Sequence, residues 1–273
     1  MASSKIRRAL FAGQFYPALA QDIKKLIAGL AEPQKNKVDC LACMLPHAGY
    51  IYSGKVASRT VAGINVKDKV ILLGPNHTGS GAPYSIMTEG AWRTPLGDVN
   101  IDSGLAKSIL ETSEYLEDDY LAHTSEHSLE VELPILQYFK ESFEIVPIAF
   151  MSEDLSVLKK IGEDIARVII KNGLKDKVLI VASSDLTHYE SLMSAEKKDK
   201  IAIEAILKLD PDKLMAEIAR LNISMCGYAP VTVMLSAALA LGAKEAELIS
   251  YQTSADATGD KSAVVGYAGI IVK

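Results

Sequence analysis

Three of the five histidines in this 273-residue chain come directly after short apolar runs. His47 lies in the sequence PHAGY, His77 in GPNH and His188 in SSDLTH, and each motif follows a stretch typical of a buried strand. In open α/β sheets, ligands bind outside the carboxyl ends of the strands, where such loops converge. A lone histidine is more often structural, but neutral imidazole is the commonest metal-binding side chain. The recurrence therefore predicts a shared site that holds a metal ion.

Cys226 and Asp185 are candidates for the same site. Cys226 comes just before an expected helix, whose N-terminus would lower the pKa of the thiol and favour the metal-binding thiolate. A buried cysteine at a helix start is an equally good interpretation. Asp185 lies three residues before His188 and is suited to orient an imidazole or to transfer a proton. It is also suited to be a helix N-cap, and the two roles are compatible.

The segment 123–130, HTSEHSLE, contains the two remaining histidines. Glu126, His127 and Glu130 would share one face of a helix that starts near position 125. The spacing is not that of an H-E-x-x-H zinc protease. We expect His127 to line the pocket, and an exposed helix is the alternative.

Cys40 and Cys43 have the C-x-x-C spacing of a redox pair or of half a zinc site. Both lie in an apolar run, and the sequence contains no second C-x-x-C. We therefore expect them to be buried cysteines of the core. Three cysteines are too few for a disulfide framework, which favours a reducing, cytoplasmic compartment.

Charge and motifs exclude several classes of function. The net charge of -5 and the lack of a long basic run argue against a nucleic-acid or anionic-membrane surface. Residues 1–17 lack the apolar run of a signal peptide, and the longest apolar stretch, 229–243, is too short to span a membrane. The sequence has no nucleotide-binding P-loop and no G-x-S-x-G motif of an α/β-hydrolase.

Apolar strands that alternate with helices must position the candidate residues. The expected strands are 38–45, 70–73, 145–150, 178–182, 247–253 and 263–272. The expected helices are 18–32, 53–64, 103–111, 126–139, 155–171, 195–209, 211–221 and 229–241. This alternation predicts one α/β domain over residues 1–273, with a mainly parallel sheet, mixed edges and helices on its faces.

Several local features refine this pattern. Ser53 is a plausible N-cap, Pro33 is expected to end the first helix, and Pro134 is expected to bend or interrupt the helix around it. The turn-rich segment 74–98 has a hairpin-like middle at 84–88. Long irregular segments of this kind are often functional loops.

A set of ordered motifs resembles the Memo family, which is widespread in archaea, bacteria and eukaryotes. The motifs are AGQFYP at 12–17, PHAGY at 46–50, GPNH at 74–77, RTPLGD at 93–98, EHSLE at 126–130, SSDLTH at 183–188 and CG at 226–227. They follow in family order and cover nearly the whole chain.

The resemblance implies a fold similar to that of the extradiol (class III) non-haem iron dioxygenases. Those enzymes hold Fe(II) with two histidines and a glutamate, whereas the corresponding pocket of Memo proteins contains two histidines and a cysteine. By this resemblance, His47 and His77 are the metal-binding histidines and Cys226 stands at the third position. His188 matches an additional pocket histidine used in acid–base roles, with Asp185 beside it. His127 would line the same cavity.

The thiolate in place of a carboxylate shifts the metal preference towards copper or zinc without excluding iron. The resemblance thus favours a metal-dependent oxidoreductase that uses iron or copper, in which His188, Asp185 and His127 serve the chemistry around the metal. Two alternatives are a peptide- or small-ligand-binding signalling protein without turnover, and a zinc hydrolase with His188, Asp185 or Glu126 as general base. The family's genomic association with an AMMECR1-like protein and a radical SAM protein implies that these are partners.

Overall fold

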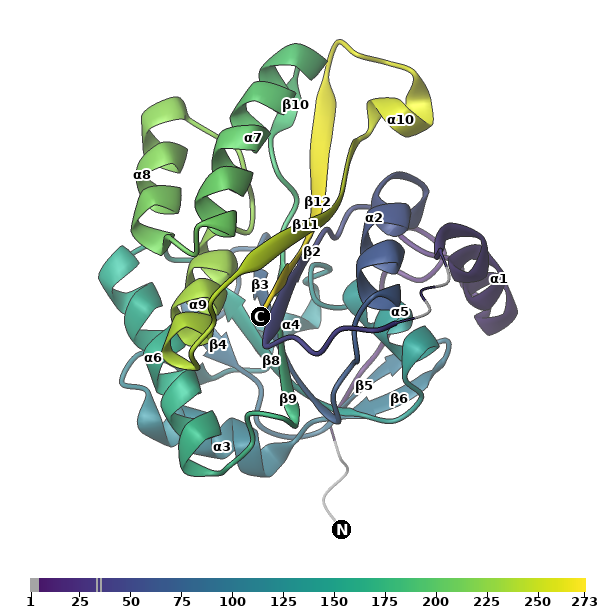
Figure 1. The fold of residues 1–273 in the computed structure, drawn as a ribbon. Coiled ribbons are helices and arrows are strands. Elements are labelled where there is room, and N and C mark those ends of the chain that lie inside the picture. Colours follow the sequence, from purple (N-terminus) through teal and green to yellow (C-terminus); the bar gives the residue numbers. More distant parts are fainter. Residues whose placement is uncertain (1–4, 33, 35) are drawn as a thin grey trace.

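Four parallel strands form the centre of the main sheet (Figure 1). They are, in spatial order, β2 (Ala42–Leu45), β9 (Val178–Ser183), β3 (Lys69–Pro75) and β8 (Glu144–Phe150). The structure is a computed structural model that describes residues 5–32, 34 and 36–273. Almost every residue of these strands is buried, as expected of strands covered on both faces. Since β2, β9 and β3 are direct neighbours, the loops that follow them open at one edge of the sheet.

Antiparallel pairs form most of the two flanks of the sheet. On one flank, β12 (Val264–Val272) runs antiparallel to β2, β10 (His188–Glu190) and β11 (Ala246–Thr253). On the other, β4 (Tyr84–Ile86) is antiparallel to β8 and parallel to β7 (Glu117–Asp118). A separate small sheet contains β1 (Ile6–Arg7), β5 (Ala91–Thr94) and β6 (Gly97–Asn100). The predicted α/β domain, with its mainly parallel sheet and mixed edges, is confirmed.

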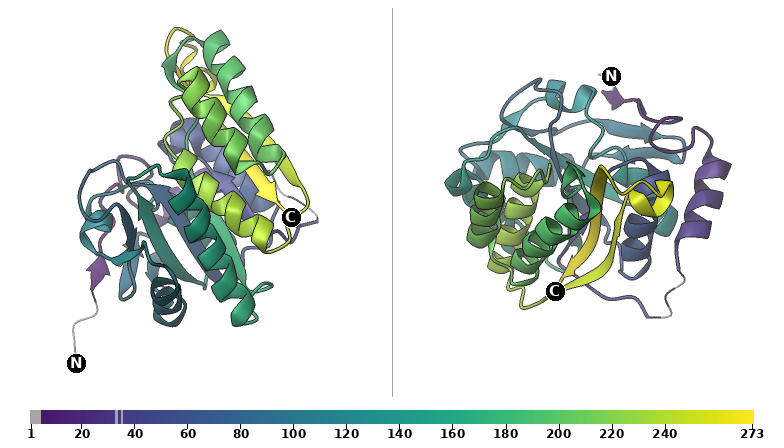
Figure 2. Two further views of the ribbon diagram at one scale, coloured as in Figure 1. Left: turned by 90° about the vertical axis from the view of Figure 1, so that its left-hand side faces the viewer. Right: turned by 90° about the horizontal axis from the view of Figure 1, so that it is seen from above.

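Helices cover both faces of the sheet (Figure 2). On one face, α6 (Leu155–Lys171) and α9 (Tyr228–Ala240) pack together, and α9 also contacts β3 and β9. On the other face, α2 (Tyr50–Ala62) packs with α5 (Glu132–Phe139). The other helices are α1 (Ala20–Leu30), α3 (Ser103–Thr112), α4 (Leu121–Thr124), α7 (Leu192–Leu207), α8 (Pro211–Leu221) and α10 (Ala255–Thr258). Within the described part of the chain, no helix has the length and apolar character needed to cross a membrane.

Polar caps and a glycine set the limits of α6, which has the predicted bounds. The carboxylate of Asp154 accepts hydrogen bonds from the backbone N–H groups of Ser156 and Val157 and so begins the helix. Gly173 follows the helix with φ of 64°, the left-handed conformation that ends many helices.

The predicted helix over 126–139 begins only at Glu132. Glu126 uses a carboxylate oxygen to accept the backbone N–H of Ser128, and the chain turns before α5 starts. Pro134 is the third residue of α5, where an N–H group would have no partner inside the helix. The helix therefore continues through this proline.

Two other local predictions are wrong as well. α2 already begins at Tyr50, and the hydroxyl of Ser53 donates to the carbonyl of Ala48 instead of capping the helix. The segment 84–88 is no hairpin, because β4 joins the main sheet beside β8. The hairpin lies between β5 and β6, where Arg93 and Asp98 of the RTPLGD motif form an exposed ion pair of 2.7 Å. Pro33 is outside the described residues, and α1 ends before it.

Candidate metal centre

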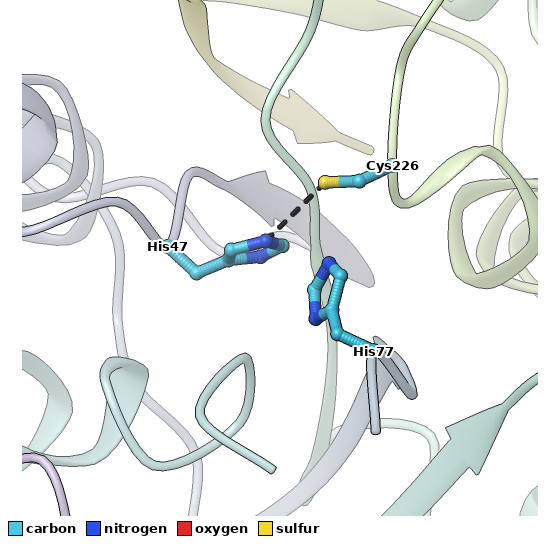
Figure 3. A group of neighbouring side chains, drawn as sticks. All are labelled: His47, His77 and Cys226. Atoms are coloured by element: carbon cyan, nitrogen blue, oxygen red, sulfur yellow. Dashed lines mark hydrogen bonds between the residues drawn. The ribbon is translucent and has the colours of Figure 1, made fainter. Parts of the chain in front are cut away.

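His47, His77 and Cys226 lie together at the edge where the parallel strands end (Figure 3). His47 follows β2, His77 follows β3, and Cys226 precedes α9. The Cys226 Sγ atom lies 3.3 Å from His47 Nε2, and the ligand atoms of the three residues all lie within 4.8 Å of one another. The structure thus brings together the residues predicted to hold the metal.

The donor atoms fit a transition-metal ion. Zinc bonds of about 2.3 Å to sulfur and about 2.0 Å to nitrogen, at a tetrahedral angle, place the two donor atoms about 3.5 Å apart. The observed 3.3 Å between Cys226 Sγ and His47 Nε2 is close to this value. Imidazole and thiolate donors suit zinc, copper and iron, and three protein ligands leave coordination positions for other molecules.

Glu126 fixes the orientation of His77. Its Oε1 atom lies 2.9 Å from His77 Nδ1, and its other oxygen accepts the backbone N–H of the same residue at 2.5 Å. Burial would raise the pKa of Glu126, but hydrogen bonds from His127 and His77 outweigh it, and the pKa lies well below its usual range. A carboxylate can only accept, so His77 carries its proton on Nδ1 and presents Nε2 to the metal site. Sequence reasoning placed Glu126 on a helix face with His127 and named it as a general base of the hydrolase alternative, but it missed this contact.

His47 is held by two residues at the end of β9. Its Nδ1 atom lies 2.8 Å from the hydroxyl of Ser183, and its backbone N–H donates to Asp185 at 2.9 Å. Burial, together with the nearby His127 and His77, lowers the pKa of His47 well below its usual range. The imidazole is therefore neutral, which is the form that binds metals.

Asp185 connects the end of β9 to the PHAGY loop. Its Oδ1 atom accepts the backbone N–H groups of His47 and Ala48 at 2.9 and 3.3 Å. The predicted N-cap role is wrong, because the described residues that follow form β10 and not the start of a helix. Burial raises the pKa of Asp185, although the charge of His188 acts in the opposite direction. Whether Asp185 transfers protons stays a prediction.

The position of Cys226 before α9 predicted a lowered thiol pKa, and this prediction is wrong. Burial of the sulfur, with the negative charge of Asp185, raises the pKa well above the usual value of a thiol. The sequence shows the helix start but neither the burial nor the carboxylate. The positive charge of a bound metal ion stabilises the thiolate, so a coordinating thiol loses its proton. Cys226 would therefore need a cation beside it to form the thiolate.

His127 lies beside the two ligand histidines. Its ring stacks on His77 with centroids 4.7 Å apart and meets His47 edge-on at 5.3 Å. Its Nδ1 atom lies 3.2 Å from Glu126 Oε1. His77, Glu126 and His127 form a second group with metal-binding spacing. The expected place of His127 is therefore correct, although the helical face used to predict it does not exist.

A segment near the N-terminus packs against His127 and Glu130. The Phe15 ring lies 4.7 Å from that of His127. Glu130 accepts hydrogen bonds from Tyr16 Oη at 2.6 Å and from Arg7 Nη1 at 2.5 Å. Arg7 and Glu130 are almost fully buried, so this ion pair ties the segment to the EHSLE motif.

His188 lies outside the group formed by His47, His77 and Cys226. It is half-buried on β10, with Nδ1 2.7 Å from the carbonyl oxygen of Ser224. It belongs to neither group of metal-spaced ligand atoms found among the described residues. Its charge affects the pKa values of Asp185 and His47, so it lies within electrostatic reach of both. Its role as a proton carrier stays a prediction.

Two glycines allow the loops of the site to approach closely. A Cβ atom at Gly74 would come within 2.6 Å of the Leu129 side chain, and one at Gly227 within 2.4 Å of the Ser183 carbonyl oxygen. The GPNH and CG motifs thus contain glycine where any side chain would collide with a neighbouring segment.

Cys40 and Cys43 are buried, as predicted. Burial raises the pKa of Cys40 to about 12 and that of Cys43 well above its usual value. Neither belongs to a group of metal-spaced ligand atoms in the described part of the chain. Both are core residues.

Known proteins resemble this chain over almost its full length. The sequence profile of the family described as "Memo-like protein" matches residues 7–271. A MEMO1 family protein of Methanopyrus kandleri is 42% identical over 281 residues, covering 98% of this chain and 99% of the relative. One of Aquifex aeolicus is 42% identical over 270 residues, with coverage of 98% and 99%.

A solved structure shares the fold. It is an uncharacterized protein of Escherichia coli K12, with a TM-score of 0.57 over 84% of this chain and 98% of that chain. At 11% sequence identity, the likeness concerns the fold alone. The sequence matches are far closer, and by them the chain belongs to the Memo-like protein family.

Proposed function

We propose that this chain is a metal-dependent oxidoreductase that binds iron or copper through His47, His77 and Cys226. The observation that carries the proposal is the convergence of two imidazoles and a cysteine sulfur, with ligand atoms within 4.8 Å of one another. A bound iron or copper ion would supply electron transfer or oxygen activation. Zinc fits the same donors and is the outcome that would favour a hydrolase.

The surrounding residues would control orientation and protons. Glu126 directs Nε2 of His77 into the site through the hydrogen bond at Nδ1. Because burial raises the pKa of Asp185, this carboxyl group would exchange a proton closer to neutral pH than an ordinary aspartate. His127, whose ring lies beside those of His47 and His77, and His188 are the other groups proposed to move protons.

Absorption spectroscopy tests the redox proposal. Protein purified anaerobically and loaded with iron or copper is expected to show thiolate-to-metal charge-transfer absorption. Cys226→Ser should abolish this absorption, whereas Cys40→Ser, which changes a cysteine outside the site, should retain it. A wild-type protein that retains only spectroscopically silent zinc would rule out the redox role.

A second candidate is a protein that binds a peptide or small apolar ligand without turnover. It is favoured by the exposed side chains of Ile51 and Tyr189, which neighbour the PHAGY and SSDLTH motifs. AMMECR1-like and radical SAM proteins are the partners to test. Binding that is lost in Tyr189→Ser but kept in Cys226→Ser would support this role over the metal-dependent one.

A further inference from the structure

Ser183 has three polar neighbours and only one proton to give. Its Oγ atom lies 2.8 Å from His47 Nδ1, 2.8 Å from the carbonyl oxygen of Ser128 and 2.8 Å from Glu132 Oε1. A hydroxyl group donates one hydrogen bond and accepts two, while a carbonyl oxygen only accepts. All three contacts can be hydrogen bonds only if Ser183 donates to Ser128 and accepts from the other two. That pattern requires a proton on His47 Nδ1 and another on Glu132 Oε1.

The surroundings of Glu132 also favour a proton on its carboxyl group. The residue is fully buried, and its Oε2 atom has no hydrogen-bond partner among the described residues. Leaving an unpartnered oxygen in the core is far more costly for a carboxylate than for a neutral acid. Burial raises the pKa of Glu132 well above its usual value. A hydrogen bond from Ser183 would lower the pKa in part, and the charge of Asp185 raises it further. Cys43 and Tyr50 also face the group, and neither can carry a positive charge.

We propose that Glu132 is an uncharged carboxylic acid that donates to Ser183 and, through it, helps to hold His47 as the Nδ1–H tautomer. The lone pair of His47 then lies on Nε2, the atom that is 3.3 Å from Cys226 Sγ. Glu132 would be a positioning residue that touches no metal, and its relevance to metal binding rests on the proposed function.

The two ligand histidines would therefore be held by glutamates in opposite charge states. Glu126 contacts His77 directly and is ionised, since its pKa lies well below the usual range. Glu132 reaches His47 only through Ser183 and is neutral. Replacement of each glutamate by glutamine should consequently have different effects, because an amide resembles a protonated acid in charge and shape but not a carboxylate.

Infrared and NMR spectra of the metal-free protein test the protonation states directly. At neutral pH the wild type should show the carbonyl stretch of a protonated carboxylic acid, which Glu132→Gln removes and Glu126→Gln retains. The ¹⁵N shifts of His47 should show a protonated Nδ1. A Glu132-dependent carboxylate band, or a protonated Nε2 on His47, would overturn the proposal. Both measurements decide it whether or not the chain proves to bind a metal.

Zinc titration then tests the consequence for metal binding. Ser183→Ala removes a partner of His47, and Glu126→Gln removes the charge and one of the two oxygens that accept from His77. For each we expect a roughly 10- to 100-fold loss of affinity. Glu132→Gln should reduce zinc affinity by less than about a tenth of the factor lost in Glu126→Gln, because it removes no charge. Ser236→Ala, which removes another buried serine hydroxyl away from the site, is the control for Ser183→Ala. Equal losses for the two glutamine variants would show that Glu132 is ionised and refute the inference.

Discussion

The Sγ atom of Cys226 lies 3.3 Å from Nε2 of His47, although 179 residues separate the two in the chain. The pairing depends on the arrangement of the backbone around Gly227, whose N–H donates to the Ser184 hydroxyl at 3.0 Å. Neither sulfur nor imidazole carries charge there, because burial raises the pKa of the thiol and lowers that of the imidazole. The site therefore offers two uncharged donors that a metal ion can bind with loss of the thiol proton.

Gly227→Ala should weaken metal binding. The new Cβ atom would come within 2.4 Å of the Ser183 carbonyl oxygen, so the segment that bears Cys226 must move away from β9. We expect at least a tenfold loss of zinc affinity, measured by competition with a chelator, since ligands must be held to about half an ångström. Gly104→Ala is the control, because its Cβ atom would find no neighbour closer than 3.5 Å. Unchanged affinity in Gly227→Ala would show that the loop position does not matter.

Arg7→Met should strongly destabilise the fold. Arg7 is buried and donates to Glu130, so its removal leaves a buried carboxylate without its positive partner, although Tyr16 still donates to it. Loss of one partner of a buried pair typically lowers the free energy of unfolding by about 3–5 kcal/mol. Lys159→Met removes an exposed ion pair with Asp212 and should change stability by less than about 1 kcal/mol. Urea unfolding compares the two, and similar small effects would argue against an important role of the Arg7–Glu130 pair.

Glu132→Gln should change the pH dependence of stability. In the unfolded chain the pKa of this carboxyl group is about 4.3, whereas burial raises it in the folded protein. Above the unfolded pKa the folded state binds more protons, so the wild type loses stability as pH rises towards the folded pKa. The glutamine variant lacks this loss, and its advantage in urea unfolding should grow by up to about 1.4 kcal/mol per pH unit. Parallel stability curves for the two proteins would indicate an ordinary pKa.

His123 should make the protein sensitive to acid. Its ring is fully buried, and both nitrogens lack a hydrogen-bond partner among the described residues. Burial, helped by the charge of Arg7, lowers the pKa of His123 to about 4. The unfolded chain takes up this proton below about pH 6.5, so stability should fall by roughly 3 kcal/mol between there and pH 4. His123→Phe should remove this part of the acid sensitivity; an identical pH profile in unfolding experiments would contradict the expectation.

The sequence contains enough information to place the histidines at one edge of the sheet. The apolar runs before His47, His77 and His188 are strands β2, β3 and β9. The loops converge because β2, β9 and β3 are neighbours in the sheet. The apolar pattern alone does not give the order of strands in a sheet. The place of Cys226 followed from the ordered motifs and not from the strand pattern.

Contacts between distant segments could not be predicted in this way. Glu132 lies in an apolar helix without a motif of its own, and its partner Ser183 is 51 residues away. The EHSLE segment looked helical because its spacing fits a helix, but Glu126 bonds to backbone N–H groups of two segments instead. Side-chain bonding to the backbone competes with helix formation, and tertiary contacts decide the result.

The metal content of the purified protein tests the proposed metal centre most directly. Wild type and the triple variant His47→Ala/His77→Ala/Cys226→Ala should be purified anaerobically, offered iron, copper and zinc, and compared by elemental analysis. Far-UV circular dichroism establishes that both are folded. We predict about one tightly bound ion per wild-type chain and almost none in the variant. Equal metal uptake by the two proteins would contradict a centre formed by these three residues.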